Sequence, residues 1–131
     1  MTSREILEEV KKVAKFLGFF TEARIYGPID KLAKPFTYND VVSALNDALR
    51  QAKVLVETSH EENISGRTLR VIEASRGRKL KAPYIPGSED LERFLELCSE
   101  DLKYAREAAL LSFTYAYSYR ITPTKEEGGE L

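Results

Sequence analysis

The chain has 131 residues, about the length of one domain, and its 43% hydrophobic and 31% charged residues exclude a disordered chain. The net charge is −1, which excludes a general attraction to nucleic acid, so any such binding must depend on local charge. One cysteine excludes an internal disulfide, one cysteine and one histidine exclude the common zinc sites, and no membrane span or signal-peptide core is present, so we expect a cytoplasmic protein.

The beginning of the chain predicts an amphipathic helix. Thr2 and Glu5 have the spacing of a capping box, in which each residue satisfies a backbone N–H of the other. Apolar residues then recur at helical spacing on one face. We therefore expect a helix over residues 3–17 that ends at Gly18, since glycine is the usual residue just after a helix.

Two more helices and a loop follow. Residues 28–34 begin with Pro28 and are followed by Pro35, which predicts a short helix that would cover the bundle as a lid. Thr37 and Asp40 can cap a longer helix over residues 38–58, which carries a continuous apolar stripe. Residues 60–66 are mostly polar, and we expect them to form a loop.

Residues 67–86 allow two interpretations. The first is a β-hairpin, because residues 68–73 are rich in β-branched side chains and residues 80–85 can return beside them. The second is a short helix over residues 66–76, capped by Gly77 and followed by an extended arm. We favour the hairpin, although the apolar pattern of so short a segment fits both.

The last predicted helix covers residues 89–119, with Ser88 as its N-cap, and its length allows a break near Ser99. Residues 122–131 are charged and contain glycine, which predicts a disordered tail. The fold class is therefore mainly α, a small bundle of about four helices with a basic β-hairpin inserted before the long last helix. Residues 1–121 form its single domain.

Few residues offer catalytic chemistry. His60 lies in a predicted loop, and Cys98 lies on an apolar helical stripe, where a small buried core residue is the ordinary interpretation. Glu92, Glu96 and Glu100 share one helix face, which suits either a divalent metal or, more simply, solvent. We expect no enzyme, no catalytic residue, no cofactor and no metal.

The strongest local signal is basic charge. Between residues 67 and 81 six residues are positive and only Glu73 is negative, in a chain of net charge −1. Such a segment can bind phosphate backbones without reading base sequence. A solvated edge strand, or docking onto the acidic residues between 89 and 101, would also explain the charge. The predicted nucleic-acid-binding residues are Arg67, Arg70, Arg76, Arg78, Lys79 and Lys81.

Aromatic residues are concentrated at the end of the last helix. They supply more aromatic surface than one core face requires, and tyrosine is enriched at protein interfaces. The alternative is that these rings complete the core against Phe19 and Phe20. The predicted protein-interface residues are Tyr115, Tyr117 and Tyr119.

The composition also indicates growth at high temperature. Glutamine occurs once, asparagine three times, and cysteine and methionine once each, while lysine, arginine and glutamate are abundant. This scarcity of thermolabile residues is the bias reported for hyperthermophiles. We therefore expect a thermophilic source.

Four segments resemble a known family. Residues 26–33, 41–50, 104–109 and 113–117 are similar to the small subunit of archaeal type I-A CRISPR surveillance complexes. The resemblance implies a helical, non-enzymatic protein of antiviral defence, which works inside a larger guide-RNA complex and helps to hold the displaced or target DNA strand. Residues 61–86 lie outside the resemblance.

The leading functional hypothesis follows from these signals together. It is a non-enzymatic small subunit of a larger ribonucleoprotein assembly, which contacts nucleic-acid backbones through the basic segment and has other protein subunits as partners. The alternative is a helical protein–protein adaptor or a homo-oligomer with no nucleic-acid role.

Overall fold

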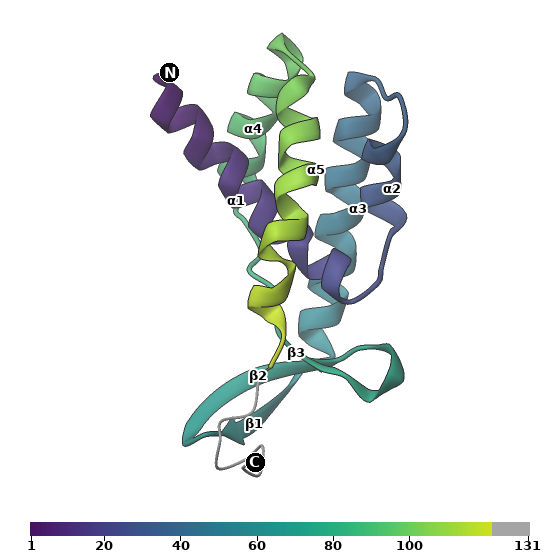
Figure 1. Ribbon diagram of the computed structural model, residues 1–131, viewed down its shortest axis with the longest axis vertical. Coiled ribbons are helices and arrows are strands. Elements are labelled where there is room, and N and C mark those ends of the chain that lie inside the picture. The colour runs from purple at the N-terminus through teal and green to yellow at the C-terminus, as the bar shows by residue number, and fades with distance from the viewer. Residues whose placement is uncertain (122–131) are drawn as a thin grey trace.

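The computed structural model describes residues 1–121, and the predicted disordered tail, residues 122–131, lies outside them. Within the described residues, five α-helices form a bundle, and a three-stranded sheet lies at one end of it (Figure 1). The predicted fold class is confirmed. The α-helices are α1 (Ser3–Glu22), α2 (Gly27–Ala33), α3 (Tyr38–Glu57), α4 (Ser88–Glu100) and α5 (Lys103–Tyr115).

Helix α1 begins as predicted but does not end at Gly18. The capping box of Thr2 and Glu5 is present, and the helix continues to Glu22. Gly18 lies inside the helix, where a Cβ atom would come within 3.0 Å of the Ser112 carbonyl oxygen and 3.2 Å of the Tyr115 Cβ. The glycine therefore permits close packing of α1 against α5, which sequence spacing alone cannot distinguish from a cap.

Substituting Gly18→Val should lower the free energy of unfolding by roughly 1–3 kcal/mol, because the new side chain overpacks the contact with α5. Urea denaturation followed by circular dichroism measures this. Gly27→Val is the control, since a Cβ there meets nothing closer than Gln51 Nε2 at 4.0 Å. Equal stability losses in the two variants would contradict the close-packing explanation.

Helices α2 and α3 are confirmed close to their predicted bounds. Thr37 and Asp40 form a second capping box at the start of α3. Lys31 of α2 donates to the Ser43 hydroxyl of α3 at 2.8 Å and pairs with the Asp47 carboxylate. These contacts hold α2 against the outside of α3.

The predicted single helix over residues 89–119 is two helices. Asp101 adopts an extended conformation (φ −155°, ψ 118°), and its side chain accepts from the backbone N–H of Lys103 at 2.9 Å. Helices α4 and α5 therefore run in opposite directions, joined at the end of the bundle away from the sheet (Figure 1). The break lies two residues beyond the position that the sequence allowed. Gly87, rather than Ser88, holds the N-cap position of α4.

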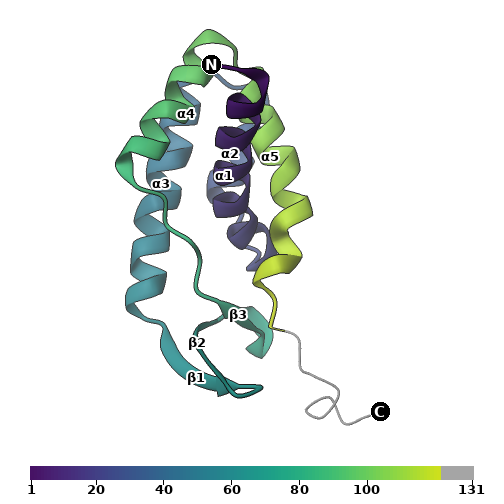
Figure 2. The ribbon, with the colours of Figure 1, turned by 90° about the vertical axis from the view of Figure 1, so that its left-hand side faces the viewer.

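The core lies where α1 meets the other helices. Figure 2 shows α5 on one side of α1 and α3 and α4 on the other. Phe20 is fully buried and makes edge-to-face contacts with Phe16 and Phe19, at centroid distances of 5.6 and 5.5 Å. Helix α1 is thus the central element of the bundle. None of the helices within residues 1–121 has both the length and the hydropathy that a membrane crossing requires.

The predicted hairpin is confirmed between β2 (Arg67–Glu73) and β3 (Lys79–Lys81), with Ile72 opposite Leu80. A further strand, β1 (His60–Ile64), pairs with β2 and gives an antiparallel sheet of order β1-β2-β3. The prediction of a loop over residues 60–66 is wrong. Residues 60–63 are all polar, so the sequence of β1 has no apolar alternation that would indicate a strand. Ser65 and Gly66 form its tight turn, with φ of 55° and 75°.

Ile72 and Leu80 attach the sheet to the bundle. Both belong to the buried core, and Leu80 also forms an isolated bridge with Arg120, which follows the short 3₁₀ helix η2 (Ala116–Tyr119). The Ile121 N–H donates to the Lys79 carbonyl at 3.4 Å. The chain beyond α5 therefore runs along the β3 edge.

Candidate nucleic-acid interface

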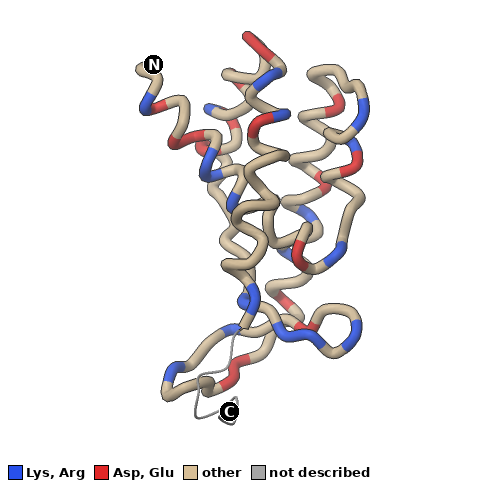
Figure 3. The backbone as a smooth tube through the Cα atoms, viewed as in Figure 1, with Lys and Arg blue, Asp and Glu red and all other residues tan. Residues whose placement is uncertain are grey.

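The basic segment lies at the sheet end of the molecule (Figure 3). Because side chains alternate along a strand, Arg67 of β2 and Lys79 and Lys81 of β3 lie on one face of the sheet, as the register of β2 and β3 shows. All three side chains are exposed. The opposite face carries Ile72 and Leu80 into the core.

Three of the six predicted cations have partners within the chain. Arg70 donates to the Ser59 hydroxyl and carbonyl, both at 3.0 Å, and lies 3.4 Å from Glu61. Lys79 donates to Glu62 at 2.9 Å. The third, Arg78, pairs with Glu22, as described next.

Glu22 is the anchor of this region. It is buried, with 6% of its surface exposed, and its carboxylate Oε2 accepts from Arg78 at 3.0 Å and from Arg120 at 2.8 Å. Its backbone carbonyl accepts from Arg78 at 2.7 Å. One acidic side chain at the end of α1 therefore fixes two guanidinium groups from distant parts of the chain.

The acidic residues between 89 and 101 do not neutralise the basic segment. Asp90 pairs instead with Lys12 and Arg93, at 3.5 and 2.6 Å. The join of α4 and α5 lies at the end of the molecule opposite the sheet (Figure 3). The basic segment therefore does not dock onto this acidic segment of the same chain, and pairing of the two segments between neighbouring chains of an oligomer stays a prediction.

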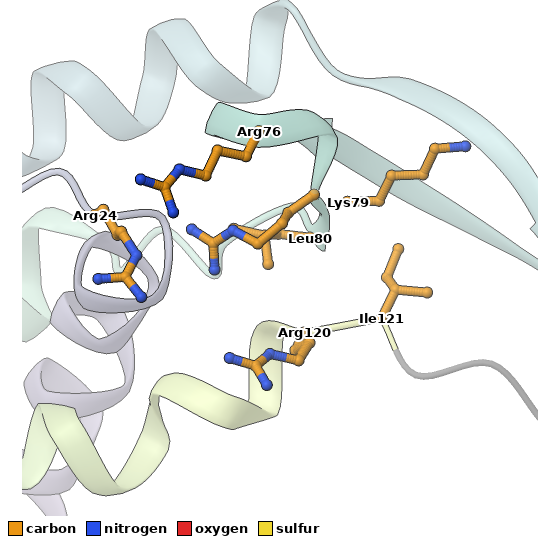
Figure 4. A pocket seen from close by; sticks show the side chains of 7 residues that line it. Arg24, Arg76, Lys79, Leu80, Arg120 and Ile121 are labelled. Carbon is orange, nitrogen blue, oxygen red and sulfur yellow. The ribbon is translucent and has the colours of Figure 1, made fainter.

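A cavity of about 410 Å³ opens between the end of α1, the β2–β3 connection with β3, and the chain that follows η2 (Figure 4). Five of its seven lining residues are positively charged. Arg24 and Arg76 form no ion pair with any carboxylate in the described part of the chain, and Arg24 donates to the Tyr26 hydroxyl at 3.5 Å. The lining residues are Arg24, Arg76, Arg78, Lys79, Leu80, Arg120 and Ile121.

Arg24 and Arg76, which have no carboxylate partner among residues 1–121, share an unusual backbone conformation. Arg24 has φ 60° and Arg76 has φ 66°, both in the left-handed region. Arg24 directly follows the C-cap of α1, a position where glycine is the usual residue. A left-handed residue other than glycine costs roughly 1–2 kcal/mol. Such residues are concentrated at functional sites.

The positive surface continues beyond this cavity. A second hollow of about 230 Å³ is lined by Arg67, Lys81, Ser65 and apolar residues, and it shares Arg120 and Ile121 with the first. The two hollows therefore form one surface, on which Arg67 and Lys81 add two cations without a carboxylate partner in residues 1–121. We call this surface, with the arginine-lined cavity, the sheet-end basic surface.

Sequence reasoning found part of this site. Arg67, Arg76, Arg78, Lys79 and Lys81 contribute to it, whereas Arg70 is held on the other sheet face by Ser59 and Glu61. Arg24, Arg120 and Glu22 were missed. No spacing in the sequence links these residues, because the fold alone brings them together.

The three predicted interface tyrosines have different surroundings. Tyr119 belongs to the core: it is 8% exposed, contacts Phe19 edge to face, and donates to the Lys15 carbonyl at 2.5 Å. Burial raises the pKa of Tyr119 to about 12. Tyr115 is half-buried, and Tyr117 is 68% exposed, with the Arg120 guanidinium 4.5 Å from its ring centroid.

Cys98 and His60, the two candidate catalytic residues, do not line the sheet-end basic surface and have structural surroundings of their own. Cys98 is buried, and burial raises the pKa of its thiol to about 12, so it stays protonated at neutral pH. His60 lies 2.6 Å from Glu62, whose pKa is held below its usual value by hydrogen bonds from His60 and Lys79. Within residues 1–121 no three histidine, cysteine or acidic side chains lie together as metal ligands would.

Residues 16–115, three quarters of the chain, match a family model of CRISPR-associated proteins, so the chain belongs to that class. The match includes residues 61–86, which lie outside the resemblance seen in the sequence. The family is the CRISPR-associated protein Cas_Csa5, and membership places the chain among the small subunits of type I-A CRISPR complexes, with other protein subunits as partners. The comparison with curated proteins gives no match.

Proposed function

We propose that this chain is a non-enzymatic subunit that holds nucleic acid by its phosphate backbone through the sheet-end basic surface. The observation that carries the proposal is the arginine-lined cavity, in which Arg24 and Arg76 lack carboxylate partners among the described residues. Guanidinium groups bind phosphate oxygens in pairs, so this surface suits backbones of any sequence.

The charge distribution supports the same function. The chain as a whole has a net charge of −1. Cationic side chains without carboxylate partners among residues 1–121 are concentrated at the sheet end, so the attraction for phosphate is local to that end. Inside a CRISPR complex, other subunits would supply the rest of the path along the strand. Affinity of the isolated chain is therefore expected to be modest and strongly dependent on salt.

Fluorescence anisotropy of labelled single-stranded DNA, duplex DNA and RNA tests this proposal. With about four phosphate contacts, affinity for a single strand should fall about 50-fold between about 50 and 200 mM salt, since each contact contributes about −0.7 to the logarithmic slope. No binding of any of the three at the lower salt concentration would contradict the proposal.

The non-enzymatic part of the proposal is supported by the surroundings of two side chains. The Cys98 thiol is buried and held protonated, which removes the ordinary nucleophile. His60 is exposed and hydrogen-bonded to Glu62 on the surface of β1. An archaeal, thermophilic source and a cytoplasmic location stay predictions from the sequence.

An adaptor function is the second candidate, and one observation favours it. An apolar groove of about 260 Å³ lies between α2 and α5, and Leu110 and Phe113 on its rim are 65% and 54% exposed. Arg106 is the one charged lining residue. The groove suits another protein subunit of the complex that presents an apolar ridge and one carboxylate for Arg106.

Light scattering coupled to size-exclusion chromatography separates the two candidates. For the leading function, the chain elutes as a monomer at low and high salt and shifts when single-stranded DNA is added. A defined oligomer that ignores DNA, and that dissociates on the paired substitution Leu110→Ser and Phe113→Ser, would favour the adaptor.

A further inference from the structure

We infer that the arginine-lined cavity is a seat for a single phosphate group, with Arg24 and Arg76 as its ligands and Glu22 as a positioning residue. The source of the phosphate, a strand backbone, rests on the proposed function. The seat itself does not, because free inorganic phosphate presents the same tetrahedral oxyanion.

The first step is the balance of charge. Five cationic residues line the cavity, and within residues 1–121 their carboxylate partners are Glu22, shared by two arginines, and Glu62, which accepts from Lys79. Arg24 and Arg76 are left without a carboxylate among residues 1–121. Figure 4 shows their guanidinium groups pointing toward the same opening. An oxyanion there would relieve the repulsion between the two arginines and accept several charge-assisted hydrogen bonds.

The second step is the backbone conformation. Arg24 and Arg76 come from different elements, yet both hold left-handed backbones where glycine is the favoured residue. Neither guanidinium forms a structural ion pair in the described chain that would compensate for this cost. Apart from the 3.5 Å contact of Arg24 with the Tyr26 hydroxyl, the contribution of these side chains that glycine could not make is a cation beside the cavity. This observation is independent of the charge count.

The third step is the wall behind the two ligands. Glu22 fixes Arg78 and Arg120 through its buried carboxylate, so these two guanidinium groups are already ordered before an anion arrives. Leu80 and Ile121 add apolar surface to the lining. Ordered donors beside apolar surface bind an anion more strongly than mobile donors in bulk water.

Calorimetric titration and thermal unfolding with inorganic phosphate, against chloride at equal ionic strength, test the inference. Phosphate should bind the wild type and raise its melting temperature. In the double variant Arg24→Gly and Arg76→Gly, phosphate affinity should fall at least about tenfold, while the melting temperature without phosphate equals or exceeds that of the wild type. A purely structural role of these arginines predicts a lower melting temperature instead.

The matched control is the double variant Arg67→Gln and Lys81→Gln, which removes the same charge from the sheet face outside the cavity. It should keep the phosphate affinity of the wild type. Phosphate binding that is absent in the wild type, or equal in the two double variants, overturns the inference. If the wild type binds phosphate but does not bind DNA, the proposed function is overturned and the phosphate site in the cavity is supported.

Discussion

Replacing Arg24 and Arg76 together with glutamate should weaken the binding of single-stranded DNA by at least about a hundredfold at low salt. Each arginine is expected to contribute a hydrogen bond to a charged phosphate, and such bonds contribute roughly 1.5–3 kcal/mol each. The loss of two therefore exceeds about 2.8 kcal/mol, which is a hundredfold in affinity. Anisotropy measured over a salt series should also give a shallower slope, by about 0.7, because the two arginines share one phosphate contact.

The control for this experiment changes the same charge elsewhere. Arg4 and Lys34 are exposed residues of α1 and of the end of α2, and neither forms an ion pair within residues 1–121. The double variant Arg4→Glu and Lys34→Glu should lose little affinity, apart from a weak long-range effect of net charge. Equal losses in the two double variants would mean that net charge, not the cavity, governs binding.

The second large effect concerns stability. Arg78→Glu should lower the free energy of unfolding by about 3 kcal/mol, because it removes one partner of the buried Glu22 and brings a second carboxylate beside it. Arg78 is 27% exposed, and Arg120 still pairs with Glu22 in the variant. The loss of unfolding free energy should therefore lie at the lower end of the values found when one partner of a buried ion pair is removed. Denaturation in urea, followed by circular dichroism, measures it.

Arg76→Glu is the matched control for stability. It makes the same change of charge in the same connection, at a side chain with no ion-pair partner among the described residues. Its unfolding free energy should stay within about 0.5 kcal/mol of the wild type, as is usual for surface positions. Comparable losses in both variants would show that the Glu22 pair does not anchor the sheet.

Where local signals dominate, the sequence predicted the fold. The capping boxes at Thr2 and Thr37 and the apolar stripes behind them located α1 and α3, because caps and periodicity depend on neighbouring residues alone. The turn at Asp101 was placed less well, since the apolar pattern continues through it from α4 into α5. Strand β1 was missed because its exposed polar residues form no alternating pattern.

The site was predicted only as far as charge is local in the sequence. The basic segment between residues 67 and 81 was visible as a run of cations. The sequence did not show which of these cations are exposed and which form ion pairs, because the partners Glu22, Glu61 and Glu62 come from other elements. Likewise, Tyr119 resembled its exposed neighbours in sequence but turns into the core against Phe19.

The shared carboxylate of Glu22 also affects the order in which the molecule can fold. Its bonds to Arg78 and Arg120 join residues 56 and 98 positions apart. Contacts this distant in sequence form late, because closing long loops costs chain entropy that short-range helices avoid. During synthesis the helices can therefore form early, while the arginine-lined cavity is completed only after residue 120 has emerged from the ribosome. A nascent chain would thus have no complete arginine-lined cavity with which to hold RNA until Arg120 can reach Glu22.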